Sequence, residues 1–294
     1  MAASGFGRVP EPPRRDLPRA IGMERARKLR RERRDGWAAA QGFSLTERDV
    51  SILYALGRCR VLRTRELARL FFGSRATASD RLRKLLVAGL VTCHVRELAA
   101  DNLYVLSERG RSVLAERLEL DARQMVVPRA LPARLDHLLA INAVRVLFTV
   151  ATRASTAPAR LVSLRAEWEL AAERHAGLIG VLPDMLVELE DSSGRTTAVA
   201  IEADTGTEGP TVVAKKLARY EGYRRSNLPL YGLDVDVVLL AAPTDRRLRS
   251  LARAVPHMSS ISIRFLNFAT ASPETLFASA VRKTDAILHA SGDS

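Results

Sequence analysis

Acidic side chains gather at the ends of two neighbouring predicted strands in this 294-residue chain. Asp184 begins the strand predicted over residues 184–189, and Glu202 and Asp204 stand at the end of the next, predicted over 198–203. Side chains two residues apart on a strand share a face, and the polar turn between the strands favours a hairpin that brings Asp184 beside them. Because Mg²⁺ prefers oxygen ligands, we expect Asp184, Glu202 and Asp204 to form a metal site.

A lysine lies four residues before a tyrosine on the helix predicted next, over residues 210–225. Lys216 and Tyr220 therefore share one face of that helix. A lysine beside such a site can orient or activate an attacking water, while the metal polarises a phosphate. The sequence thus predicts Asp184, Glu202 and Lys216 as catalytic residues of a metal-dependent nuclease.

This pattern resembles the PD-(D/E)xK nuclease superfamily, in which an Asp on one strand and an acidic-x-Lys on the next surround the metal. Asp184 and Glu202 match the first two positions, whereas Asp204 stands where the superfamily has Lys. The resemblance implies a restriction-endonuclease-like core in which Lys216, from the following helix, supplies the amine. The alternative is structural, with Asp184 ending a loop and Asp204 capping a turn.

Other titratable side chains near this pattern give weaker signals. Glu167, Glu169 and Glu173 fall on a helix predicted before the strands, where a solvated face is favoured over a metal ligand. His137 falls on the helix predicted over 135–153 and has no Cys or His at metal-ligand spacing, so a core or surface role is favoured.

Residues 44–106 follow the order of a winged helix-turn-helix, a module that places its last helix in a DNA major groove. Each predicted helix has a capping residue at its start, and a tight turn precedes the third helix. The predicted elements are a helix with a capping box of Ser44 and Glu47, a helix over 65–71 capped by Thr64, a helix over 75–88 capped by Ser74, and wing strands over 91–95 and 103–106.

The third helix is the expected DNA-reading element, because its first two turns present basic and hydroxyl side chains to solvent. Arginine is the commonest specific reader of guanine, and Ser or Thr contacts bases or phosphates. Use of the same fold for protein contact or dimerisation is the alternative. The predicted DNA contacts, which include one on the preceding helix and one near the wing tip, are Arg65, Arg75, Thr77, Ser79, Arg81, Arg83, Lys84 and Arg96.

The charge distribution favours a polyanionic partner, since the formal net charge is +13. Residues 1–43 carry 11 basic and 5 acidic side chains, which predicts a basic, disordered arm. Neither a transmembrane stretch nor a secretory signal is visible, so a cytoplasmic protein is expected. The predicted domains are the arm at 1–43, an α+β winged helix-turn-helix domain at 44–122, a linker at 123–134 and an α/β nuclease-like domain at 135–290.

The chain also resembles the replication-relaxation family of bacterial plasmid and mobile-element proteins over about residues 44–270. The helix-turn-helix part of the resemblance is generic, and the part in the second domain is more specific. The segments that carry it include 45–49, 64–74, 81–85, 88–90, 104–106, Arg109-Gly110, His137 with Asn142, 182–184, and 202–208 followed by Lys216 and Tyr220.

What this resemblance implies is a DNA-binding protein that acts in replication, copy control or relaxation of plasmid or mobile-element DNA. A Mg²⁺-dependent DNA endonuclease targeted by the winged helix and a transcriptional regulator are the alternatives. The expected partners are double-stranded DNA, a second copy of the chain, and replication or mobilisation proteins, with no membrane partner.

Overall fold

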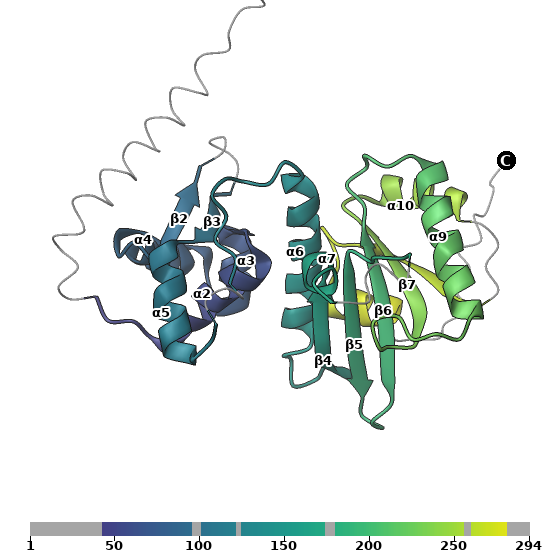
Figure 1. Ribbon diagram of the computed structural model, residues 1–294, viewed down its shortest axis with the longest axis horizontal. Helices are drawn as coiled ribbons and strands as arrows, with labels where there is room; N and C mark the ends of the chain where they lie inside the picture. The colour runs from purple at the N-terminus through teal and green to yellow at the C-terminus, as the bar shows by residue number, and fades with distance from the viewer. Residues whose placement is uncertain (1–42, 96–100, 122–124, 174–179, 256–259, 281–294) are drawn as a thin grey trace, which may run out of the picture. The chain divides into compact units, whose positions relative to one another are not determined.

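The computed structural model describes residues 43–95, 101–121, 125–173, 180–255 and 260–280 (Figure 1). The chain divides into two compact units, Met1–Pro128 and Arg129–Ser294. The predicted arm up to residue 42, the predicted contact Arg96 and the start of the predicted linker lie outside the described residues. None of the described helices is long and apolar enough to cross a membrane.

The first unit consists of helices around a small antiparallel sheet, in the order β1-β3-β2. The elements follow the predicted order of helix, helix, turn, helix and hairpin, and a short additional strand, β1, lies between the first two helices. The elements are α2 (Glu47–Cys59), β1 (Leu62–Arg63), α3 (Thr64–Phe71), α4 (Arg75–Val87), β2 (Val91–His94), β3 (Leu103–Leu106) and α5 (Glu108–Leu118).

The first two helices begin at caps other than those predicted. In α2 the hydroxyl of Thr46 accepts from the Asp49 N–H, and the Asp49 carboxylate accepts from the Thr46 N–H at 2.7 Å. The predicted capping box of Ser44 and Glu47 is therefore wrong by two residues, although the spacing rule holds for Thr46 and Asp49.

The helix α3 already includes Thr64, so this residue is not the predicted cap. Arg63 occupies the cap position, and the Glu66 carboxylate accepts from the Arg63 backbone N–H at 2.8 Å. In α4 the cap is the predicted Ser74, whose hydroxyl accepts from the Thr77 N–H. These caps fix where α3 and α4 start and hence which side chains α4 exposes.

The second unit is a mixed α/β arrangement around a five-stranded sheet in the order β4-β5-β6-β7-β8. Strands β4, β5 and β6 are antiparallel, and β6, β7 and β8 are parallel. The elements are α6 (Leu135–Ala151), β4 (Ala159–Ala166), α7 (Glu167–Leu170), β5 (Met185–Asp191), β6 (Thr196–Ala203), α9 (Pro210–Arg225), β7 (Val235–Ala242), α10 (Asp245–Ala254), β8 (Ser262–Asn267) and α11 (Pro273–Ala280).

Helices cover both faces of this sheet (Figure 1). On one face α6 packs against β4 and β6, and α11 packs against β7, β8 and α6, with Phe148 and Val187 in one buried cluster. On the other face α9 and α10 form a second cluster, with Leu217 and Leu186. Because neighbouring residues of β5 point to opposite faces, Leu186 and Val187 belong to different clusters. The sheet is thus the middle of three layers, and its end near the start of β5 carries the polar residues described next.

Candidate functional site

Asp184 lies directly before β5, at the point where the neighbouring strand β6 ends. Met185 pairs with Ile201 in the antiparallel register, which brings Asp184 level with the last residues of β6. One carboxylate oxygen, Oδ2, accepts from the Ala203 backbone N–H at 2.8 Å, and Asp184 is only 6% exposed. The predicted hairpin therefore holds this carboxylate in a fixed place.

The other two predicted catalytic residues lie beside Asp184. Glu202, near the end of β6, is 6% exposed and forms an ion pair with Lys216 from α9. The Tyr220 hydroxyl, one turn further along α9, donates to the Glu202 carboxylate. The Lys216 Nζ is also 3.9 Å from Asp184 Oδ1. The structure thus brings Asp184, Glu202 and Lys216 together at one pocket, as the spacing predicts.

Burial and neighbouring charges perturb this cluster. Burial and the negative charge of Asp184 raise the pKa of Glu202 to about 8, and Lys216 and Tyr220 only partly oppose the rise. Burial also tends to raise the pKa of Asp184, but the adjacent His137 imidazole and the charge of Lys216 outweigh it and hold that pKa below its ordinary value. The two carboxyl groups therefore differ in proton affinity, which is typical of functional sites.

Asp204 does not join the two buried carboxylates as a metal ligand. Both of its oxygens are bound by the Arg247 guanidinium from α10, at 2.8 and 2.7 Å, and Oδ1 also accepts from the Gly206 N–H at 2.6 Å. The prediction from strand alternation is wrong because Asp204 lies beyond the end of β6, where a turn begins. Asp204 instead forms an ion pair with Arg247 and accepts a hydrogen bond within the turn that follows β6.

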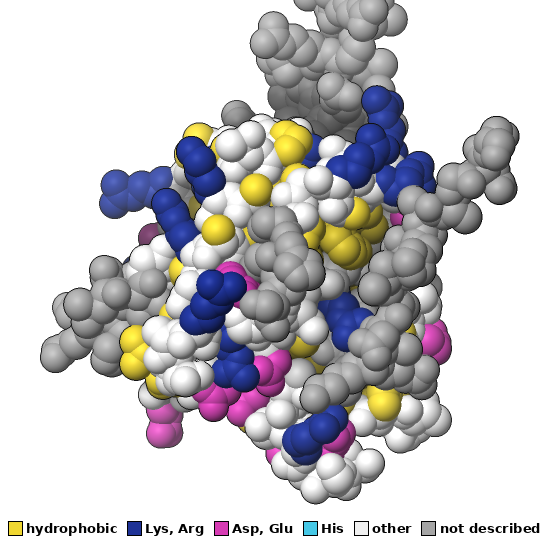
Figure 2. Space-filling view, turned by 90° about the vertical axis from the view of Figure 1, so that its right-hand side faces the viewer, with side chains coloured by type: hydrophobic (Ala, Val, Ile, Leu, Met, Phe, Trp, Pro, Cys, Tyr) yellow, Lys and Arg dark blue, Asp and Glu magenta, His cyan; other side chains and the backbone are white. Residues whose placement is uncertain are grey.

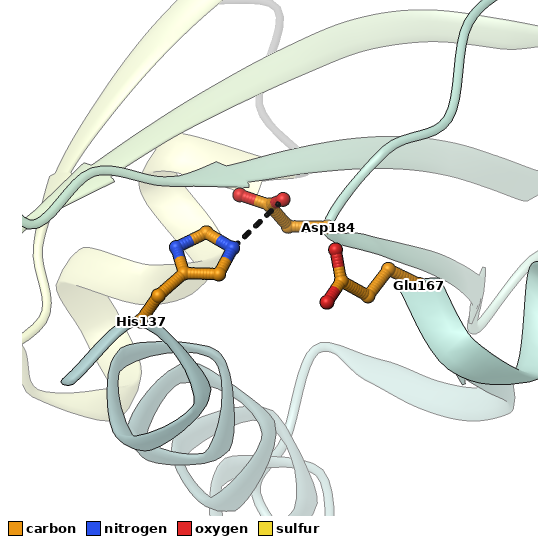
Figure 3. Close-up of side chains that lie close together, drawn as sticks. All are labelled: His137, Glu167 and Asp184. Atoms are coloured by element: carbon orange, nitrogen blue, oxygen red, sulfur yellow. Dashed lines mark ion pairs between the residues drawn. The ribbon is translucent and has the colours of Figure 1, made fainter. Parts of the chain in front are cut away.

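Two residues that the sequence did not favour also lie close to Asp184. His137, on the first turn of α6, places Nε2 3.2 Å from Asp184 Oδ1. Glu167 begins α7, and one ligand atom from each of His137, Glu167 and Asp184 lies within 4.8 Å of the others (Figure 3). The Asp184 carboxylate beside it raises the pKa of His137 despite its burial. Only the tertiary fold brings α6, α7 and β5 together, so no local spacing signals this group.

Most predicted DNA contacts on α4 are exposed. Thr77, Ser79, Arg83 and Lys84 all face solvent, and Arg83 and Lys84 have no ion pair within the described parts of the chain. The core side of the helix carries Ala78, Leu82, Leu85 and Leu86, as predicted.

The remaining basic residues of this set divide into two groups. Arg65 and Arg75 are 56% and 64% exposed in their side chains, and both contact the carboxylate of Asp101. Arg81, in contrast, binds the fully buried Asp49 through two nitrogens and donates to the Ser44 carbonyl at 2.9 Å. The prediction of Arg81 as a DNA contact is therefore corrected, because its guanidinium is engaged within the unit.

Comparison with known families gives one match. The family model described as Replication-relaxation matches residues 53–233, more than half of the chain. The matched segment includes α4 and the cluster of Asp184, Glu202 and Lys216. No curated protein and no solved structure matches the chain significantly.

Proposed function

The chain belongs to the replication-relaxation family, and we propose that it serves replication or relaxation by binding double-stranded DNA through α4 of its first unit. The observation that carries the proposal is the exposed side of α4. Arg83 and Lys84 stand on it with no ion pair among the described residues, next to the hydroxyls of Thr77 and Ser79.

The order of elements in the first unit supports this assignment. Two helices, a turn and a third helix followed by a hairpin match the winged helix-turn-helix, in which the last helix enters the major groove. Asp101 gathers the Arg65 and Arg75 guanidinium groups beside the N-terminal end of α4. These two arginines stay exposed and therefore extend the basic surface toward the backbone of a duplex.

The test is binding of the full chain to duplex DNA, followed by fluorescence anisotropy. The double variant Arg83→Ala, Lys84→Ala is compared with Arg109→Ala, Arg117→Ala, which removes the same charge from α5. We expect about 1–3 kcal/mol of lost binding free energy for each removed side chain that contacts a base. Equal affinities of the α4 and α5 variants would contradict the proposal.

A second function, metal-dependent cleavage of DNA, is supported by the convergence of Asp184, Glu202 and Lys216. The predicted set of three carboxylates does not form, because Arg247 holds Asp204. Asp184 and Glu202 remain, and one or two carboxylates beside substrate phosphates are the usual protein contribution to a Mg²⁺ site. Mg²⁺ there would polarise a phosphate, and Lys216 would orient the attacking water.

Positive charge lies beside this pocket. Lys215 and Arg219 of α9 border a groove together with Lys216 and the exposed apolar residue Val212. The side of the molecule on which α9 and α10 lie in Figure 1 shows several Lys and Arg side chains among hydrophobic and acidic ones (Figure 2). The Lys and Arg side chains at this groove would attract a phosphate backbone toward the carboxylates.

Incubation with supercoiled plasmid and Mg²⁺ or Mn²⁺ separates the two functions. If the protein cleaves DNA, the wild type is expected to produce nicked or linear plasmid and Glu202→Gln is expected to leave it intact, while both proteins still bind DNA. If both proteins slow the migration of the plasmid in the gel but leave it uncut, DNA binding is retained as the function and the cleavage proposal is rejected.

A further inference from the structure

We propose that His137, Glu167 and Asp184 form a binding site for a divalent transition-metal ion of the Mn²⁺ or Zn²⁺ class. These three residues come from α6, the start of α7 and the loop before β5, and they converge on one point (Figure 3). The site lies in the second unit and shares only Asp184 with the proposed cleavage site. It does not depend on the proposed DNA binding or on cleavage.

The separation of the donor atoms fits two ligands of one ion. Imidazole nitrogen and carboxylate oxygen each bind such ions at about 2.0–2.2 Å, so adjacent ligands of one ion lie roughly 3.0–3.5 Å apart. His137 Nε2 and Asp184 Oδ1 are 3.2 Å apart. The third donor atom, from Glu167, lies within 4.8 Å of the other two, which is close enough for one ion to draw the three together.

The side chains have free coordinating capacity at this point. His137 Nε2 is fully buried and makes no well-aligned hydrogen bond despite its closeness to Asp184. No described residue donates a hydrogen bond to the Glu167 carboxylate. A divalent cation bound at this point would replace the proton between the His137 ring nitrogen and Asp184 and would face the Glu167 carboxylate as well.

Neighbouring groups orient the proposed ligands, as is usual around metal sites. The Ala203 N–H fixes Asp184 through Oδ2 and leaves Oδ1 directed toward His137. The Glu167 backbone N–H donates to the Asp184 carbonyl at 2.8 Å, which locks the start of α7 to the start of β5. Lys216 lies 3.9 Å from Asp184 Oδ1 and forms its closer ion pair with Glu202.

The donor types decide the class of ion. Mg²⁺ and Ca²⁺ take oxygen ligands, whereas imidazole suits Zn²⁺ and other first-row transition metals, and Mn²⁺ accepts carboxylate together with imidazole. One imidazole and two carboxylates therefore favour Mn²⁺ or Zn²⁺ over Mg²⁺. This composition differs from the all-carboxylate Mg²⁺ site that the sequence alone predicts.

Isothermal titration of the full chain with MnCl₂, ZnCl₂ and MgCl₂ tests the site. We expect His137→Gln and Glu167→Gln each to weaken Mn²⁺ or Zn²⁺ binding by at least about tenfold, the loss typical even of residues that only support a ligand. Two matched controls are expected to bind like the wild type: His94→Gln in the first unit, and Glu208→Gln, which lines the same pocket but does not belong to the group of three ligands.

Thermal unfolding with and without metal provides the second measurement. The wild type and both controls are expected to gain melting temperature with Mn²⁺ or Zn²⁺, and His137→Gln and Glu167→Gln are expected to lose that gain. Because each ligand is replaced separately, the proposal can still be tested with the second variant if the first one fails to fold. Wild-type affinity in both ligand variants, no binding by the wild type, or equally tight binding of Mg²⁺ would overturn the proposal.

Discussion

Asp49 and Arg81 illustrate how one contact changes the role of a residue. Arg81 lies among exposed basic residues of α4, but two of its nitrogens bind the carboxylate of Asp49, which is fully buried. The same carboxylate caps α2 through the Thr46 N–H. Arg81 therefore ties the start of α2 to the middle of α4, and its neighbour Arg83 remains available for a ligand.

The substitution Arg81→Ala is expected to destabilise the protein, because it leaves the Asp49 carboxylate buried without its cation. We expect a loss of about 3 kcal/mol in the free energy of unfolding, the lower end of the range for breaking a buried pair, because Arg81 is 22% exposed. Urea denaturation measures it, with Arg83→Ala as the matched control within about 0.5 kcal/mol of the wild type. Equal losses in the two variants would contradict the assigned roles.

The same pair predicts a pH dependence of stability. Burial tends to raise the pKa of Asp49, but the hydrogen bonds from Arg81 and Thr46 outweigh it and hold that pKa below the ordinary 3.8. A lowered pKa in the folded state contributes stability above pH 3.8, and the contribution is lost as the pH falls through the lowered value.

The stability difference between the wild type and Asp49→Asn should therefore shrink when the pH is lowered below 3.8. Urea denaturation between about pH 2.5 and 6 measures this difference, since the range brackets the carboxyl group's ordinary pKa. A difference that stays constant over the range would show that the Asp49 charge contributes nothing to stability.

At the scale of single residues, the sequence predicts contacts that follow from local spacing. Strand register and helical periodicity are enough to bring Asp184, Glu202 and Lys216 together. His137 and Glu167 could not be found this way, because their approach to Asp184 depends on how α6 and α7 pack on the sheet. Arg81 could not be separated from Arg83 by sequence, because its partner Asp49 is 32 residues away.

Helix α5 shows how an element depends on close backbone packing. Its first turn contains Gly110, where an added Cβ would lie 2.1 Å from the Leu90 carbonyl oxygen and 2.9 Å from a Leu106 methyl group. The Ser107 hydroxyl accepts from the Gly110 N–H at 2.9 Å and caps the helix. The absence of a side chain at Gly110 thus allows α5 to pack against the start of the hairpin.

The substitution Gly110→Ala is expected to destabilise the protein by about 1–3 kcal/mol or more, because the added methyl group overlaps a backbone atom that cannot rotate away. Gly73→Ala is the matched control, since no heavy atom lies within 4 Å of its added Cβ and its φ is not positive. Thermal unfolding of both variants measures the effect. Equal melting temperatures would contradict the packing described for α5.

At the scale of elements, long periodic segments were predicted well and irregular ones were not. The helix Pro210–Arg225 is confirmed at both ends, and the hairpin of β5 and β6 is confirmed with shifted ends. The edge strand β4 was missed because a register shift between Leu161 and Ser163 breaks its alternation of buried and exposed residues.

For the whole molecule, the basic surplus is concentrated away from the second unit. Residues 44–128 carry 15 basic and 10 acidic side chains, whereas residues 129–294 carry 20 and 18. Residues 1–43 add a further excess of six positive charges, which by itself favours non-specific binding to any polyanion. A test of α4 must therefore keep this segment and change only the helix.

The salt dependence of duplex binding by the full chain tests the central claim most directly. The logarithm of the binding constant falls linearly with the logarithm of salt concentration, and the slope loses about one unit for each phosphate contact removed. We predict that Arg83→Ala, Lys84→Ala weakens binding and either flattens the slope, if these side chains contact phosphates, or relaxes sequence preference, if they contact bases. The α5 control, Arg109→Ala, Arg117→Ala, should retain the affinity, slope and preference of the wild type. Identical affinity, slope and preference in both variants would contradict the role of α4 in DNA binding.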